Sequence, residues 1–104
     1  MPYGVLLRCE VVAWVDHNFP GWVRVRLVDA DLKPWFFVDK VPIFTPGRLH
    51  AETSLPTAVR LRCRIVGQDS DGVFTVSTSP DGVAAVGGQA LFRVTEAAID
   101  RHTV

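Results

Sequence analysis

Apolar and polar residues alternate along most of this chain, with the period that is typical of β-strands. From Val5 to Val15 every second residue is apolar, and the positions between them carry Arg8 and Glu10. The same alternation returns over residues 22–28 and 59–66. A period of two places one set of side chains on a buried face and the other set on the opposite face. The pattern therefore predicts half-buried strands.

Turn-forming residues separate these runs at regular intervals. Clusters of Asn, Asp, Ser, Pro and Gly occur at residues 16–21, 29–34, 68–72 and 79–82. Further extended runs lie between them, at residues 35–39, 73–78 and 90–94. Short strands with this spacing and no long helix indicate a sandwich or a barrel. We expect an all-β fold, a small antiparallel and partly open β-barrel of five to seven strands, of the oligonucleotide-binding (OB) or SH3-like type.

The remaining segments are less regular. Pro42 and Pro46 exclude a regular central strand around them. Residues 83–86 are expected to extend a strand as far as the Gly87–Gly88 break. At most one short helical turn is expected, over residues 95–102, where Thr95 is a suitable N-cap.

The chain contains an internal echo. Residues 7–13 (LRCEVVA) match residues 61–67 (LRCRIVG), and each is followed by a similar order of turns and strands. Two explanations are open: two related three-stranded meanders, or a chance likeness of two strands. A length of 104 residues suits one domain. We expect a single barrel domain (1–104), made of a meander (1–44), a connection (45–58), a second meander (59–99) and a tail (100–104).

Composition and charge exclude some classes of partner. Eleven basic and eleven acidic residues give no net charge, so no overall field attracts nucleic acid or an anionic membrane. No run of 18 or more apolar residues predicts a membrane span. The N-terminus lacks the features of a signal peptide. Cys9 and Cys63 lie in apolar runs, which favours buried, reduced thiols. We therefore expect a cytoplasmic protein with no membrane partner.

The alternation also predicts how the first three strands pair. Opposing Trp14 with Trp22, and Leu27 with Phe36, makes every inward pair apolar and places Glu10 opposite Arg26. A slip of one residue would turn the apolar set outward. This register predicts an outer face with aromatic and basic residues: Trp14, Trp22, Trp35, Phe37, Arg24 and Arg26.

An aromatic face framed by Arg is typical of the core of a protein interface. The leading hypothesis is therefore a non-enzymatic module that binds another protein through this face. An inhibitor or immunity-type protein, an adaptor and a homodimer all fit the sequence. The alternative use of the face is internal, with residues 45–58 or the C-terminal turn folded over it.

A second hypothesis is binding of single-stranded nucleic acid. Arg60, Arg62 and Arg64 share one face of a predicted strand and could follow a phosphate backbone, as in oligonucleotide-binding barrels. Only two lysines accompany them, and the acidic turns would repel phosphate. Nucleic acid is therefore the less favoured partner.

A third hypothesis, an enzyme, depends on four polar residues. Asp16, His17, Asp39 and Lys40 could meet at one end of the barrel, and a His–Asp pair can act as a general acid and base. Turns contain such residues for backbone reasons alone. The three His and two Cys have no metal-site spacing, and no cofactor motif occurs. We expect no enzymatic activity, no cofactor and no metal site.

Overall fold

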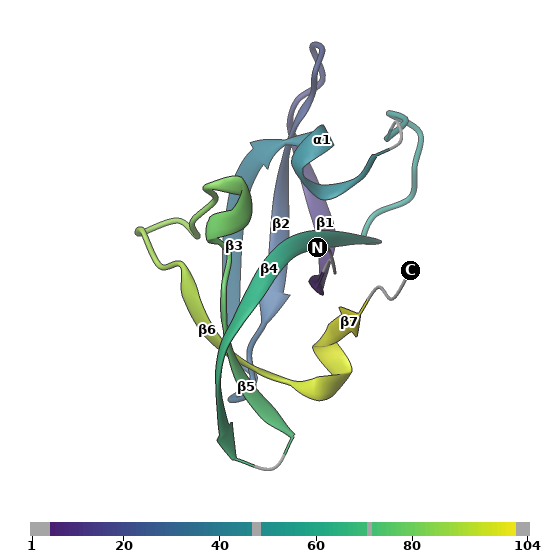
Figure 1. The fold of residues 1–104 in the computed structure, drawn as a ribbon. Coiled ribbons are helices and arrows are strands. Elements are labelled where there is room, and N and C mark those ends of the chain that lie inside the picture. Colours follow the sequence, from purple (N-terminus) through teal and green to yellow (C-terminus); the bar gives the residue numbers. More distant parts are fainter. Residues whose placement is uncertain (1–4, 47–48, 71, 102–104) are drawn as a thin grey trace.

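The computed structural model describes residues 5–46, 49–70 and 72–101. Within these ranges seven strands form one antiparallel sheet that curls into a half-barrel (Figure 1). The strands are β1 (Val5–Asp16), β2 (Trp22–Val28), β3 (Pro34–Lys40), β4 (Thr57–Ser70), β5 (Val73–Ser77), β6 (Leu91–Thr95) and β7 (Ile99–Arg101). Helix α1 (Val41–Phe44) and the 3-10 turns η1 (Ser79–Asp81) and η2 (Glu96–Ala98) complete the fold. The prediction of a small all-β, barrel-like fold is confirmed.

The strand order follows from two meanders placed side by side. The order β3-β2-β1-β4-β5-β6 puts β1 and β4 at the centre, paired antiparallel with Leu7 opposite Leu61. β2 and β7 share one edge of β1, where β2 pairs with its second half and β7 with its first residues. The long strand β4 likewise pairs with β1 over its first half and with β5 over its second half.

The two meanders have the same pairing register. In the sequence echo Leu7 corresponds to Leu61, and Glu10 corresponds to Arg64. Glu10 pairs with Arg26 in the first meander, and Arg64 pairs with Ser77 at the equivalent place in the second. β-Bulges interrupt the pairing of β1 with β2 between Val11 and Ala13 and between Trp14 and Asp16. The pairing of β4 with β5 has bulges at the equivalent positions, between Ile65 and Gly67 and between Gln68 and Ser70. A bulge adds one residue and bends its strand, so shared bulges give both meanders the same curvature.

The match continues into the turns that flank the strands. Gly21 precedes β2 and Gly72 precedes β5, with φ of 87° and 71°. The Gly21 carbonyl accepts a hydrogen bond from Val41 N–H, and the Gly72 carbonyl accepts one from Glu96 N–H, each at 2.9 Å. Val41 and Glu96 begin α1 and η2, the turns that follow β3 and β6. The sequence echo therefore corresponds to a structural repeat.

Inward-facing side chains of both meanders form one core. Its fully buried members include Leu7, Val25, Phe37, Leu61 and Val94. The open side of the curl, between β3 and β6, is closed by loops and aromatic rings. Val86 N–H donates to the Phe36 carbonyl at 2.7 Å, and Ala30 N–H donates to the Arg93 carbonyl at 2.8 Å. The Phe92 ring lies 5.4 Å from Trp35 and 5.6 Å from Phe37, between centroids.

One local prediction was wrong and another is confirmed in part. Residues 83–86 are not a strand, because isolated hydrogen bonds hold this segment across the open side: the Thr78 hydroxyl donates to the Val83 carbonyl, and Val86 N–H donates to β3. The helical turn expected within residues 95–102 is the 3-10 turn η2, which has Thr95 at its N-cap position but no hydrogen bond from the Thr95 side chain. Ile99 instead turns into the core and opens strand β7.

Helices long and apolar enough to cross a membrane do not occur among the described residues.

Candidate protein-binding face

The outer surface of β2 and β3 carries aromatic, aliphatic and basic side chains side by side. Alternation along β2 turns Val23, Val25 and Leu27 into the core and leaves the residues between them outside. Trp22 lies opposite Lys40, and Trp22 is 37% exposed. Farther along the two strands, Arg24 lies opposite Val38 and Arg26 lies opposite Phe36, and these four residues also point outward.

We call the surface made by Trp22, Arg24, Phe36, Val38 and Lys40 the β2–β3 face. The guanidinium of Arg24 lies 4.2 Å from the centre of the Phe36 ring, and the Lys40 amine lies 5.9 Å from the centre of Trp22. Neither cation is paired with a carboxylate within the described residues. Exposed cation–π contacts contribute only about 0.5–1 kcal/mol. Both cations can therefore turn to an external carboxylate at small cost.

Arg26 borders this face and is already paired. Its Nη2 donates to Glu10 Oε1 at 2.6 Å, and both side chains are more than a third exposed. The predicted pairing of Glu10 with Arg26 is thereby confirmed. An exposed pair of this kind contributes about 0–1 kcal/mol. Arg26 brings less unpaired charge to the face than Arg24 does.

The predicted register of β2 and β3 was wrong by one residue. Leu27 lies opposite Trp35 instead of Phe36, so the outward set of β3 is reversed. Phe37, predicted on the outer face, is fully buried in the core and cannot touch a partner. Phe36 and Val38 take the outward positions instead. The apolar run of β3 left both registers open, which is why sequence alternation missed these two residues.

Trp14 also leaves the predicted face. The bulge between Val11 and Ala13 inserts one residue, so Trp14 lies opposite Val23 instead of Trp22. Its ring packs against the core and over Gly21, and it stacks on His17 with centroids 4.6 Å apart.

Trp35 is half-buried for a different reason. Its Nε1 donates to Asp29 Oδ2 at 2.9 Å, and its ring packs against the core. The Lys33 amine lies over the ring, 4.2 Å from its centre. Of the predicted face, Trp22, Arg24 and Arg26 lie outside as expected, while Trp14, Trp35 and Phe37 do not.

The described part of the connection lies beside Trp14 of the predicted face, but neither it nor the C-terminal turn covers the β2–β3 face. Leu49 and Leu55 pack against the core. Residues 49–51 line a concavity of about 300 Å³ beside the β1–β2 hairpin, together with Trp14 and Phe19. β7 pairs with β1. Val38 remains 38% exposed, so these segments leave the β2–β3 face open to solvent.

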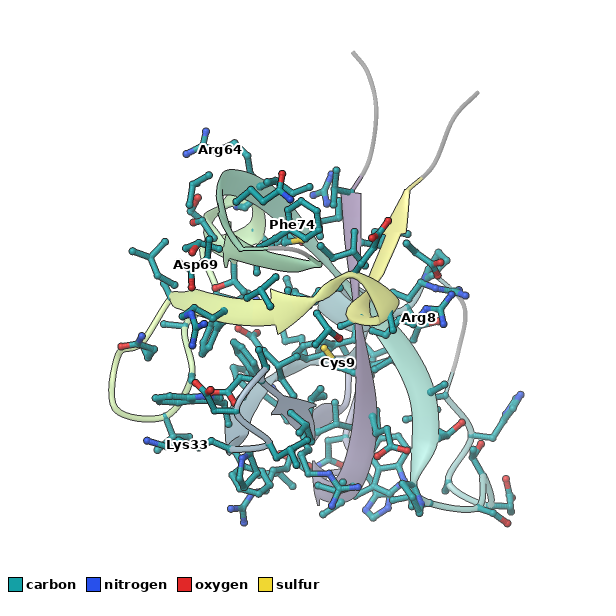
Figure 2. All side chains as sticks on the ribbon, turned by 90° about the horizontal axis from the view of Figure 1, so that it is seen from below. Arg8, Cys9, Lys33, Arg64, Asp69 and Phe74 are labelled. Carbon is teal, nitrogen blue, oxygen red and sulfur yellow. The ribbon has the colours of Figure 1, made fainter. Side chains whose placement is uncertain are left out.

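The arginines proposed for nucleic acid have different surroundings from one another. Arg60 Nε donates to Asp100 Oδ2 at 2.6 Å, and Asp100 also accepts from Arg8 at 2.7 Å. Hydrogen bonds from these two guanidinium groups lower the pKa of Asp100. Arg62 is paired with Asp81. Arg64 is exposed and points away from the barrel (Figure 2). The two pairs reduce the charge that this stripe offers to phosphate.

The four residues of the enzyme hypothesis are not joined in a catalytic arrangement. Asp16 Oδ1 accepts from Asn18 N–H at 2.9 Å, and Asp39 Oδ1 accepts from Lys40 N–H at 2.7 Å. Both carboxylates thus serve turn or strand-end backbone. Within the described residues no hydrogen bond links His17 to Asp39. The His17 ring stacks on Trp14 instead.

The two cysteines lie in the core. Burial raises the pKa of the Cys9 thiol to about 12 and that of Cys63 to about 11. Figure 2 shows the Cys9 sulfur inside the curl of the sheet. Such thiols stay protonated at neutral pH, which suits packing and not nucleophilic chemistry. Across the described ranges, groups of three or more His, Cys, Asp or Glu that could hold a metal ion do not occur.

Comparisons with known proteins give no relative: no family model, no curated protein and no solved structure matches this chain.

Proposed function

We propose that this protein is a non-enzymatic binding module whose β2–β3 face docks on an acidic surface of another protein. The observation that carries the proposal is the composition of that face. Trp22 and Val38 remain exposed, and they alternate with Arg24 and Lys40, whose charges have no carboxylate partner within the described residues. Aromatic residues and Arg are the types enriched at interface hot spots.

Charge decides between an unlike partner and a second copy. A two-fold symmetric dimer brings the same patch of each copy together. Arg24 and Lys40 would then face the same two cations of the other copy, and like charges in contact oppose association. A partner with exposed Asp or Glu around an apolar centre complements this face instead. The proposal therefore favours an adaptor or inhibitor over a homodimer through this surface.

The test is a capture experiment with charge-reversed baits. Wild-type protein, Arg24→Glu and Arg64→Glu are immobilised and exposed to extract from the source cells, and bound proteins are quantified. Arg64→Glu is the matched control, because Arg64 is an exposed strand arginine on β4, outside the β2–β3 face.

The expected result is a protein retained by wild type and by Arg64→Glu, and reduced at least about tenfold on Arg24→Glu. Reversal of one rim charge lowers association and makes it depend on salt. Equal retention of every bound protein by the two variants would contradict the proposal. Retention of single-stranded nucleic acid that is lost in Arg64→Glu would support the arginine stripe of β4 instead.

A further inference from the structure

Strand β7 pairs with the first residues of β1 and shows which side chains suit a short strand at this edge. Its three residues pair antiparallel with Val5 to Leu7. Ile99 lies opposite Leu7, turns into the core and is only 8% exposed. Asp100 lies opposite Leu6 and turns outward, where it accepts hydrogen bonds from two arginines. An apolar residue followed by an acidic residue therefore suits this edge.

The structural repeat places an equivalent edge on β4. Val5 to Leu7 of β1 match Val59 to Leu61 of β4. On the side away from β1, β5 pairs with β4 only from Arg64 onward. Residues 57–62 of β4 have no strand neighbour on that side in the part of the chain that the structure describes. Their backbone hydrogen bonds in that part go to β1.

The first meander does not supply the missing strand. α1 leaves β3 as η2 leaves β6, starting from the same hydrogen bond to a glycine carbonyl. After η2 the chain continues as β7, whereas after α1 it continues as Thr45 and Pro46, which form no strand. Proline has no N–H to donate to a sheet. In the described part of the chain, no strand takes the place on β4 that corresponds to β7 on β1.

A groove of about 630 Å³ lies at this place. One side is β4 itself, with Val59, Arg60 and Arg62, and the other is an apolar wall that includes Ile43 and Phe44 of α1. Figure 1 shows α1 and η1 beside the first half of β4. Volumes of 300–1,000 Å³ are usual for ligand sites. The groove is large enough for a few residues of extended chain.

We propose that the free edge of β4 binds an extended peptide segment of another protein, which joins the sheet as a short antiparallel strand. Main-chain hydrogen bonds supply affinity in this mode, and alternate side chains supply specificity. By the pattern of β7, the guest places an apolar residue inward opposite Leu61 and an Asp or Glu outward opposite Arg60. Within the described residues Asp100 accepts from Arg60 Nε, and the Nη groups of Arg60 remain as donors for a guest carboxylate.

This site uses none of the residues of the β2–β3 face. The peptide site on β4 and the protein-binding β2–β3 face can therefore be tested separately, and a negative result for one does not contradict the other. The probe is a blocked hexapeptide, acetyl-Thr-Val-Ile-Asp-Val-Thr-amide, titrated into ¹⁵N-labelled protein. The expected result is saturable amide shifts centred on residues 57–62, with slowed hydrogen exchange of alternate amides there.

Matched peptides and variants sharpen this test. Only every second N–H of a strand faces its neighbour. Methylating the peptide nitrogens that face β4 should therefore abolish binding, whereas methylating the nitrogens between them should not. Replacing the peptide Asp by Lys should weaken binding by about two- to fivefold, the range of a cross-strand charge pair. Arg60→Ala should weaken it similarly. Arg64→Ala should not, because Arg64 lies where β4 is already paired with β5.

Three outcomes overturn the proposal. The first is no saturable shift at millimolar peptide. The second is shifts centred on Trp22 and Val38 instead of residues 57–62. The third is a dimer, seen by sedimentation, whose formation protects the amides of residues 57–62, since that would assign the edge to a second copy. A thermal melt of Arg60→Ala beside wild type separates lost binding from lost folding.

Discussion

Gly21 and Gly72 hold equivalent places in the two meanders but have different neighbours. Both have positive φ, which strains any residue with a Cβ. A Cβ on Gly21 would lie 3.1 Å from the Trp14 ring and 3.2 Å from Val41. A Cβ on Gly72 would meet nothing within 4 Å. Gly21 is therefore required for packing as well as for backbone conformation.

This difference predicts unequal costs for the same substitution. Gly72→Ala should lower the free energy of unfolding by about 1–2 kcal/mol, the cost of a left-handed non-glycine residue. Gly21→Ala should lower it by a further 1–3 kcal/mol or so, because an overpacked site must shift. Urea denaturation of the two variants measures both values. Equal losses would contradict the close approach of Trp14 to Gly21.

The buried thiols predict how stability depends on alkaline pH. Burial raises the pKa of Cys9 to about 12 in the folded protein, above the ordinary value of 9.0. A raised folded pKa gives stability that is fully present below the unfolded pKa and is lost as pH rises through the folded one. The free energy of unfolding should therefore fall between about pH 9 and pH 12.

A Cys9→Ala, Cys63→Ala variant provides the control, because it removes both thiols and keeps the other alkaline titrations. Its free energy of unfolding should fall less steeply over the same pH range in urea titrations. Identical slopes for wild type and variant would mean that the thiols ionise equally well in the folded and unfolded chains.

The β2–β3 turn is the element that decides the register of the candidate face. Asp29 Oδ1 accepts from Asp31 N–H at 2.8 Å and Lys33 N–H at 2.9 Å, and its Oδ2 accepts from Trp35 Nε1. Burial raises the pKa of Asp29, but these hydrogen bonds outweigh it and the net shift is downward. The Asp29 carboxylate thus accepts hydrogen bonds from the backbone of the turn and also from the Trp35 side chain.

Asp29→Ala should lower the free energy of unfolding by about 2–3 kcal/mol, because it leaves polar groups without their acceptor. Asp31→Ala is the matched control, since it removes an exposed pair with Arg93 that contributes about 0–1 kcal/mol. Because the Asp29 pKa is lowered on folding, its stabilisation is present above the ordinary pKa and is lost in acid. Chemical denaturation at pH 7 and at pH 3 measures both effects, and equal losses in the two variants at pH 7 would contradict this role.

Alternation predicted the strands well and their register less well. Leu7, Cys9 and Val11 face inward as a period of two requires. Beyond Val11 the bulges reverse the parity, so Val15 is exposed. No single-residue preference marks a bulge, and the continuous apolar run Trp35 to Val38 suits either face. The errors in predicted register therefore misplaced Trp14, Trp35 and Phe37, three of the aromatic residues that had defined the candidate site.

At the scale of the molecule, the echo of residues 7–13 in 61–67 left a repeat and a chance likeness equally open. The paired bulges and glycine turns of the two meanders decide for the repeat. The departures from symmetry could not be seen in sequence, because they depend on contacts between distant segments. β7 pairs with one edge of β1, whereas no strand among the described residues pairs with the corresponding edge of β4.

Charge is also arranged differently from what the totals suggest. Arg60, Arg62 and Arg93 are each paired with Asp residues, which lie in turns, in β7 or near the end of β4. Arg24 and Lys40 are left without such partners in the described part of the chain. A chain with no net charge thus presents one face that is locally basic and apolar, the β2–β3 face that we propose binds the protein partner.

The most direct test of that claim is the affinity of the captured protein for wild type and for Trp22→Ala, with unfolding measured on the same preparations. Trp22→Ala should weaken binding by about 30-fold, the effect of about 2 kcal/mol at an interface hot spot. The free energy of unfolding should fall by less than the binding free energy, because more than a third of Trp22 stays exposed in the unbound protein. Unchanged affinity, or a loss of affinity matched by an equal loss of folding, would contradict the proposed function.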